Sequence, residues 1–96
     1  MYMKEAIKKR VLHRSKIIEG QIKGLQKMID DENYCVDIMT QSLAIQKSLS
    51  SLNKLVLQNH IETHITHMLR SDDHATKIKA QEELLSLYEL NNIRGK

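Results

Sequence analysis

The chain has 96 residues, and 41% of them are hydrophobic, but it contains no proline, no Phe and no Trp. Its apolar residues are mainly Leu, Ile, Val, Met and Ala, and no β-type alternation is visible, so a β-rich fold is excluded. The sequence therefore predicts one all-α domain over residues 1–96.

Residues 4–30 are predicted to form the first helix. Apolar side chains recur along it at helical spacing: Ile7, Val11, Ile18, Ile22, Leu25 and Ile29. Gly20 interrupts this stripe, but the stripe resumes after it, so we interpret Gly20 as a close-packing position and not as a helix end. The polar residues 30–33 predict a turn, in which Asp31 or Asn33 is expected to cap the next helix.

A long central helix is predicted over residues 34–70, because this stretch has no glycine or proline. Its apolar face is formed by Ile38, Ile45, Leu49, Leu52 and Val56. A third helix is expected to follow, with Ser71 or Asp72 as its N-cap and an end near Leu90. Residues 91–96 are predicted to be a frayed tail.

The single cysteine, Cys35, excludes an intramolecular disulfide. The N-terminal segment MYMKEAIKKR lacks the apolar run of a signal peptide. No stretch approaches the roughly 18 apolar residues of a membrane span. We therefore expect a cytoplasmic protein without membrane contact, which oligomerises because a few helices of this length bury little core alone.

Cys35 lies at one end of the central helix, and His60, His64 and His67 lie at the other, at spacings that put them on one face. Along one helix, Cys35 and His60 would be about 37 Å apart, so they cannot bind one metal ion within a chain. An antiparallel dimer with its two-fold axis near Leu49 would bring Cys35 of one chain beside His60 and His64 of the other. Such ligands favour Cu(I) or Zn(II), with Ni(II) and Co(II) as further candidates. The alternatives are a solvated histidine face and a buried, inert thiol.

Residues 1–27 carry eight basic and two acidic side chains, a balance of +6, which leaves −3 for the rest. A basic end of this kind favours a polyanionic partner such as DNA, with a solvated face as the alternative. No helix-turn-helix pattern is visible. The segment HIETH at residues 60–64 differs from the zinc-protease motif because Glu62 comes one position late to be its general base. We therefore expect that the protein is not an enzyme.

These residues together resemble the copper-sensing operon repressor (CsoR) family over about residues 4–90. The resemblance is carried by Arg14, Gly20, Gln21, Tyr34, Cys35, Val36, Asp37, Gln41 and the segment NHIETH at residues 59–64. It implies a three-helix protomer with a long central helix, an antiparallel homodimer and a flat homotetramer of two dimers. It also implies a transcriptional repressor that releases double-stranded operator DNA when its inducer binds.

In this resemblance, Cys35, His60 and His64 match the three inducer ligands of the family. The third ligand is usually Cys in the copper type, whereas His occurs in the nickel/cobalt type and in some copper sensors. The nickel/cobalt type also uses His at the position of Met3. The formaldehyde type needs Pro at the position of Tyr2, and the persulfide type needs a second Cys, which this chain lacks.

The resemblance also assigns supporting and DNA-contacting residues. Tyr34 and Glu83 match the residues that support the ligands, Glu83 on the third helix if a short insertion in the preceding loop is allowed. Arg14 and Lys54 fall at DNA-contact positions, whereas Ser51 replaces a basic residue there. We expect phosphate contacts from Arg14, Lys8, Lys9, Arg10 and Lys54.

The sequence thus predicts a repressor that is released from DNA by Cu(I), bound by Cys35, His60 and His64. His67 is a further candidate ligand, although a surface position is the favoured interpretation for it. The alternatives are a nickel, cobalt or zinc sensor of the same family, and a metal-storage or metal-transfer protein without a DNA role.

Overall fold

The helices of the protein are α1 (Glu5–Asp30), α2 (Cys35–His60), the π-helical turn η1 (Ile61–Ile65), α3 (Thr66–Leu69) and α4 (His74–Ile93). The structure is a computed structural model that describes residues 3–93, with side chains as far as residue 90. No strand occurs in that part of the chain, and the all-α prediction is confirmed. Two compact units make up the fold, the first ending at Asn59 and the second beginning at His60. The prediction of one domain over residues 1–96 stays a prediction.

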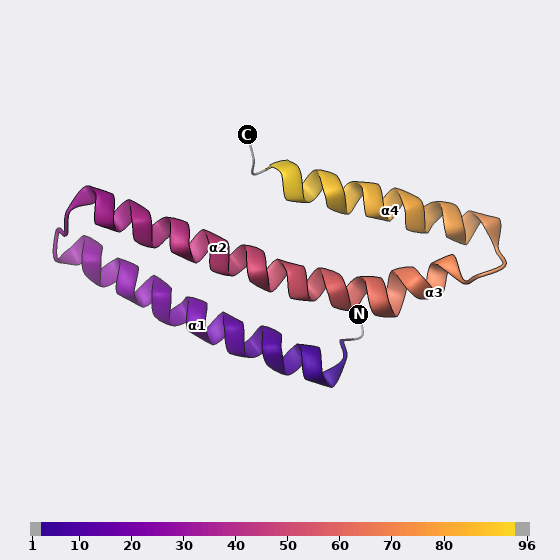
Figure 1. The fold of residues 1–96 in the computed structure, drawn as a ribbon, viewed down its shortest axis with the longest axis horizontal. Helices are drawn as coiled ribbons and strands as arrows, with labels where there is room; N and C mark the ends of the chain where they lie inside the picture. The colour runs from indigo at the N-terminus through magenta and orange to yellow at the C-terminus, as the bar shows by residue number, and fades with distance from the viewer. Residues whose placement is uncertain (1–2, 94–96) are drawn as a thin grey trace. The chain divides into compact units, whose positions relative to one another are not determined.

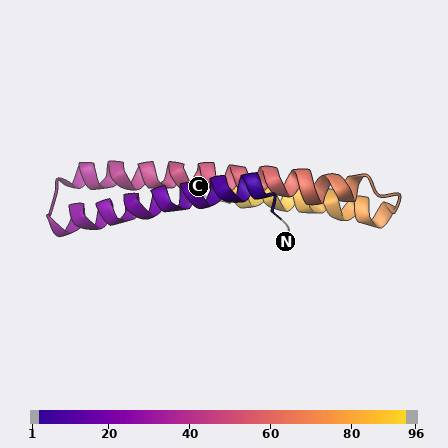
Figure 2. The same cartoon turned by 90° about the horizontal axis from the view of Figure 1, so that it is seen from below.

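The first unit is a hairpin in which α1 lies alongside α2 (Figures 1 and 2). The turn between them closes α1 with a Schellman motif: Asn33 N–H donates to Met28 O at 2.9 Å, and Glu32 N–H donates to Ile29 O at 3.0 Å. Glu32 takes the left-handed conformation, with φ of 53°, that glycine usually supplies at this position. Asp31, one of the two expected caps of the second helix, is instead the C-cap residue of α1.

Two hydrogen bonds join the two arms of the hairpin, one at its open end and one within the paired helices. Lys4 N–H donates to Asn59 Oδ1 at 3.0 Å, and Gln41 Nε2 donates to Gln21 O at 3.3 Å. The pairing of an early residue of α1 with a late residue of α2 makes the two helices antiparallel. The buried apolar side chains of the hairpin are Ile7, Ile18, Ile45 and Leu55.

Gly20 does not have the role that the sequence suggested. Helix α1 continues through it, as predicted. However, a Cβ built at Gly20 would meet no atom within 4 Å, so the close-packing interpretation is wrong for the protomer. The glycine that faces α2 is Gly24, where a Cβ would lie 3.9 Å from Gln41 Nε2.

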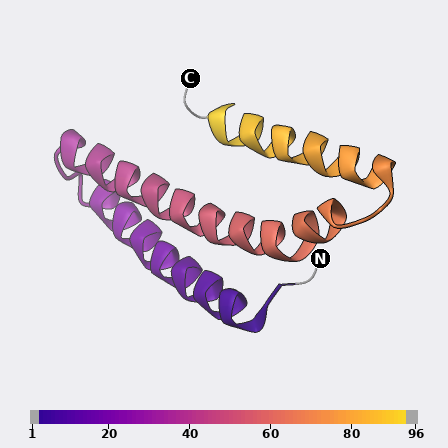
Figure 3. The ribbon, with the colours of Figure 1, turned by 45° about the vertical axis from the view of Figure 1, so that its right-hand side comes forward.

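The second unit contains η1, α3 and α4, and α4 turns back along α3 (Figures 1 and 3). The single α-helix expected over residues 34–70 is wrong in one respect, because its α-helical hydrogen bonding is interrupted by η1. The expected N-caps Ser71 and Asp72 are also wrong. Helix α4 begins at His74, and Asp73 precedes it, accepting a hydrogen bond from Thr76 Oγ1 at 2.7 Å.

Helix α4 ends at Ile93, later than the expected end near Leu90, and it includes the first three residues of the predicted tail. Residues 94–96 of that tail lie outside the described residues. Only Ile65 and Ala80 are buried apolar residues among the described side chains of this unit.

Three residues of the predicted apolar faces are exposed in the protomer: Ile22 and Ile29 in α1, and Leu49 in α2. Val36, Met39 and Leu43 of α2, which the predicted face did not include, are exposed as well. None of the described helices is long and apolar enough to cross a membrane.

Candidate metal centre

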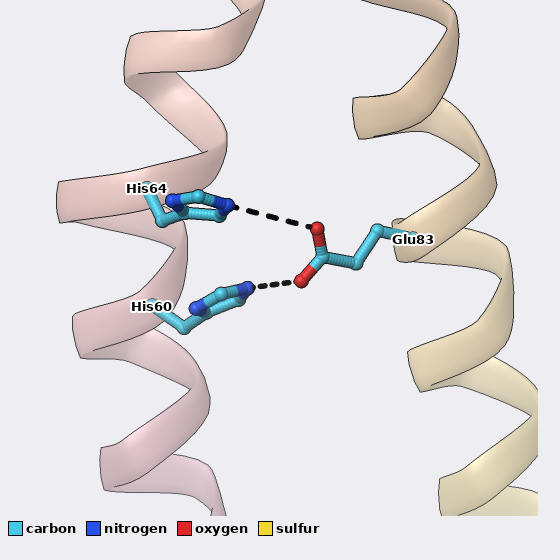
Figure 4. A network of polar contacts seen from close by, with 3 residues as sticks. All are labelled: His60, His64 and Glu83. Carbon is cyan, nitrogen blue, oxygen red and sulfur yellow. Dashed lines mark hydrogen bonds and ion pairs between the residues drawn. The ribbon is translucent and has the colours of Figure 1, made fainter. Parts of the chain in front are cut away.

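His60, His64 and Glu83 form a group of three potential metal ligands within the second unit (Figure 4). His60 Nε2 lies 2.5 Å from Glu83 Oε1, and His64 Nε2 lies 3.9 Å from Glu83 Oε2. One atom from each of the three residues can be chosen so that all lie within 4.8 Å of one another. The carboxylate of α4 therefore faces both imidazoles and bridges them.

The two imidazoles are held side by side. Their ring centroids are 4.9 Å apart, and the ring planes differ by 29°, which is a stacked arrangement. His60 is the last residue of α2, and His64 lies in η1. The spacing of four residues puts them on one side of the helix, as the sequence predicted.

The π-helical turn η1, which follows His60 and contains His64, is closed at its C-terminal end by hydrogen bonds from Thr66. The backbone N–H of Thr66 donates to Ile61 O, which is the five-residue hydrogen bond of a π turn, and Thr66 Oγ1 donates to the same carbonyl at 2.7 Å. Single π turns inside α-helices often occur at functional sites. Here the turn contains one of the two candidate ligands and directly follows the other.

The side chains of the group differ in their exposure to solvent. His60 is 14% exposed, Glu83 is 36% exposed and His64 is 51% exposed. The contact between His60 and Glu83 is therefore partly shielded from water, and an N–H donated to a carboxylate is a strong, charge-assisted hydrogen bond when either group is ionised. A carboxylate bonded to a ligating histidine fixes its tautomer and orientation.

The other predicted ligands do not belong to this group. Cys35 is the first residue of α2 and is an exposed, free thiol. Tyr34 precedes it and is 72% exposed. His67 lies in α3, is exposed, and is not part of the three-residue group found among the described residues.

The predicted DNA-contacting residues lie in the first unit. Lys8, Lys9 and Arg10 are exposed on α1, Arg14 is half-buried there, and Lys54 is exposed on α2. A surface hollow on α1 is lined by Lys9, Arg10, His13, Arg14 and Ile17. Several of the predicted phosphate contacts thus surround one depression of the basic helix.

The role of Asn59 in the packing of the hairpin was not predicted from the sequence. Asn59 is completely buried, beside His60 in the chain, and accepts the hydrogen bond from Lys4 N–H. The available signal was its position seven residues after Leu52 and three after Val56, on the predicted apolar face, where an apolar side chain is expected.

Comparison with known proteins identifies the family. The model of the metal-sensitive transcriptional repressor family matches residues 7–90 of this chain. The chain belongs to this family. The repressor family is a class of regulators and not of enzymes, and the resemblance to the CsoR family is confirmed.

Two curated proteins that are similar to this chain are named copper-sensing transcriptional repressor CsoR. The chain is 32% identical over 81 residues to the CsoR protein of Bacillus subtilis (strain 168), and the alignment covers 84% of this chain and 77% of that protein. The chain is 41% identical over 58 residues to the CsoR protein of Mycobacterium tuberculosis (strain ATCC 25618 / H37Rv), and this alignment covers 60% of this chain and 49% of that protein. The match thus spans about half the length of the mycobacterial relative.

A solved structure is also similar to this chain. It is the crystal structure of the copper-sensing repressor CsoR with Cu(I) from Geobacillus thermodenitrificans NG80-2, which is 26% identical to this chain. The TM-score is 0.75, and the alignment covers 93% of each chain. The three-helix prediction therefore agrees with the fold of a metal-responsive relative.

Proposed function

We propose that this repressor binds operator DNA and is released from it when Cu(I) binds. The observation that carries the proposal is the pair of stacked imidazoles, His60 and His64, supported by Glu83. This pair occurs in a chain whose family consists of metal-sensitive repressors and whose relatives include copper sensors. The protein would act in the cytoplasm, where it meets its operator.

The metal site would be built from two protomers. Cys35 and His60 are the first and last residues of α2, a helix of 26 residues, and so lie about 37 Å apart. An antiparallel homodimer would place Cys35 of one protomer beside His60 and His64 of the other, and would build this site twice. Exposed apolar residues close to Cys35, namely Val36, Met39 and Leu43, are consistent with a surface that another protomer covers. Two such dimers would form the homotetramer.

The donor set fits Cu(I) because a thiolate is soft and an imidazole is borderline. In this set, Cys35 and both histidines would hold the ion, and Glu83 would keep the His60 ring in place through Nε2. With its Nε2 proton donated to the carboxylate, His60 has its lone pair on Nδ1. Tyr34 would accompany Cys35 and support it from the other protomer.

The DNA contacts would come from the basic surface of the first unit, with Arg14, Lys8, Lys9, Arg10 and Lys54 bonded to phosphates. Binding of Cu(I) across two protomers would favour an arrangement of these surfaces that fits DNA poorly. A coupling free energy of about 1–3 kcal/mol between the two sites is typical of such regulation. It corresponds to a loss of DNA affinity of roughly 5- to 150-fold.

The test is an anaerobic titration of the complex between the protein and the DNA upstream of its own gene. We expect Cu(I) to dissociate this complex and Ni(II), Co(II) and Zn(II) to dissociate it poorly, with chelator competition used to rank the affinities. Dissociation by Ni(II) or Co(II) with no effect of Cu(I) would contradict the copper assignment. Failure to bind the DNA at low salt would favour a metal-storage or metal-transfer role.

A further inference from the structure

The group of His60, His64 and Glu83 contains three potential metal ligands that come from one protomer, without Cys35. We propose that it is a second metal-binding mode, in which one protomer binds a divalent ion such as Co(II) or Zn(II) through two imidazoles and the Glu83 carboxylate. This mode shares its histidines with the proposed Cu(I) site but needs no second chain. It can therefore be tested separately from the response to Cu(I).

The distances in the group are close to those that a metal ion requires. Zinc binds histidine nitrogen at about 2.0–2.1 Å and carboxylate oxygen at about 2.0–2.2 Å, so two ligand atoms of a tetrahedral ion lie about 3.3 Å apart. The distances of 2.5 Å from His60 Nε2 to Glu83 Oε1 and of 3.9 Å from His64 Nε2 to Glu83 Oε2 lie on either side of this value. All three ligand atoms lie within 4.8 Å of one another, at most about 1.5 Å above this value, so side-chain movements of that order would bring them to one ion.

The side chains already point toward a common centre. Both Nε2 atoms face the carboxylate of Glu83, one toward each oxygen (Figure 4). A metal ion placed between the two Nε2 atoms and the carboxylate would replace the proton that His60 donates to Glu83. The hydrogen bond in the metal-free protein therefore already holds His60 and Glu83 close to the positions that the ion requires. The remaining coordination positions would be taken by water, as in zinc sites that have three protein ligands.

The backbone around the group is anchored by neighbouring residues. Ile65, which follows His64, is 1% exposed, and Ala80, one helical turn before Glu83, is completely buried. Thr66 adds two hydrogen bonds to the carbonyl of Ile61 within the same turn. Ligands on packed helices lose little freedom when a metal binds, which favours affinity.

The chemistry of the donors separates the two modes. A carboxylate with two imidazoles suits a divalent borderline ion, whereas the thiolate of Cys35 suits Cu(I). A divalent ion bound within one protomer makes no link between two chains. The second mode therefore gives a structural reason for metal binding that leaves the repressor on its DNA.

The probe is Co(II), added anaerobically to the metal-free protein, with binding measured by visible ligand-field absorption and by calorimetry. We expect no thiolate-to-cobalt charge-transfer absorption, and equal Co(II) affinity, within about twofold, for the wild type and Cys35→Ala. In the Cys35→Ala background, Glu83→Gln should weaken Co(II) binding at least tenfold. Glu82→Gln, which changes the adjacent exposed glutamate in the same way, should have no effect.

Three results would overturn the proposal. The first is a charge-transfer absorption in the wild type that disappears in Cys35→Ala, because it would show that Cys35 is a ligand of Co(II). The second is equal Co(II) affinity for Glu83→Gln and Glu82→Gln, and the third is no detectable Co(II) binding by Cys35→Ala. The release of wild-type protein from DNA by Cu(I) is a different measurement, so the two proposals can fail independently.

Discussion

Asn59 is expected to be one of the residues on which the stability of the hairpin depends most. Its side chain is completely buried, and its Oδ1 accepts the N–H of Lys4, the N-cap residue of α1, at a distance of 3.0 Å. The side chain of Lys4 makes no cap hydrogen bond itself. Asn59 thus satisfies, from α2, one of the backbone N–H groups that a helix leaves unpaired at its start.

We predict that Asn59→Ala lowers the free energy of unfolding by about 2 kcal/mol, because it empties a fully buried position and leaves the part-buried N–H of Lys4 without this acceptor. For a domain of this size, this is a decrease in Tm of roughly 8–16 °C. Urea unfolding followed by circular dichroism, at one fixed protein concentration because the chain is expected to oligomerise, measures the change.

The matched control is Asn53→Ala, since Asn53 is an exposed asparagine of the same helix. Both substitutions gain the same helix propensity from alanine, so their difference isolates the tertiary contribution of Asn59. The control is expected to stay within about 0.5 kcal/mol of the wild type. Equal stabilities of the two variants would refute the argument that Asn59 holds the start of α1.

Three further predictions concern the site, the DNA surface and α4. A mixture of Cys35→Ala and His60→Ala protomers should recover about one Cu(I) site per mixed dimer, although neither variant alone has an intact site; a mixture that binds no more Cu(I) than its components would exclude a site shared between chains. Arg14→Ala should weaken operator binding and reduce the log–log salt slope by about 0.9, the value for one phosphate contact, with little change in metal affinity. Lys27→Ala, at the other end of α1, serves as the control, and equal slopes for the two variants would move the DNA contact away from Arg14. The hydrogen bond from Thr76 Oγ1 holds the pKa of Asp73 below its usual value of 3.8. The ionised Asp73 carboxylate, which caps the start of α4, therefore contributes stability above about pH 3.8, and this stability is lost as the pH falls through the lower pKa of the folded state. Asp73→Asn keeps a good N-cap that does not titrate, so its unfolding free energy should fall less in acid than that of the wild type, and parallel pH profiles would contradict the assignment.

Local patterns in the sequence were sufficient to predict the helices and the two imidazoles on one face. The spacing of His60 and His64 is a property of one helical turn, and it needs no information from elsewhere in the chain. The separation of Cys35 from His60 likewise follows from the rise of a helix. A turn at residues 30–33 was also predicted from composition, but its left-handed residue, Glu32, was not, because no glycine marks it.

The tertiary structure was needed wherever a residue depends on a distant partner. Glu83 was assigned to the site only by resemblance, and its contact with His60, 23 residues earlier, depends on how α4 packs in the second unit. Asn59 reads as a polar residue on an apolar face until the N–H of Lys4, 55 residues away, is placed against it. The π turn at residues 61–65 has no helix-breaking residue, and it differs from an α-helical turn only in which carbonyl the N–H of Thr66 meets. Helical periodicity is a local property and can be read from spacing, whereas these contacts are made by groups whose positions are determined only when the helices pack together.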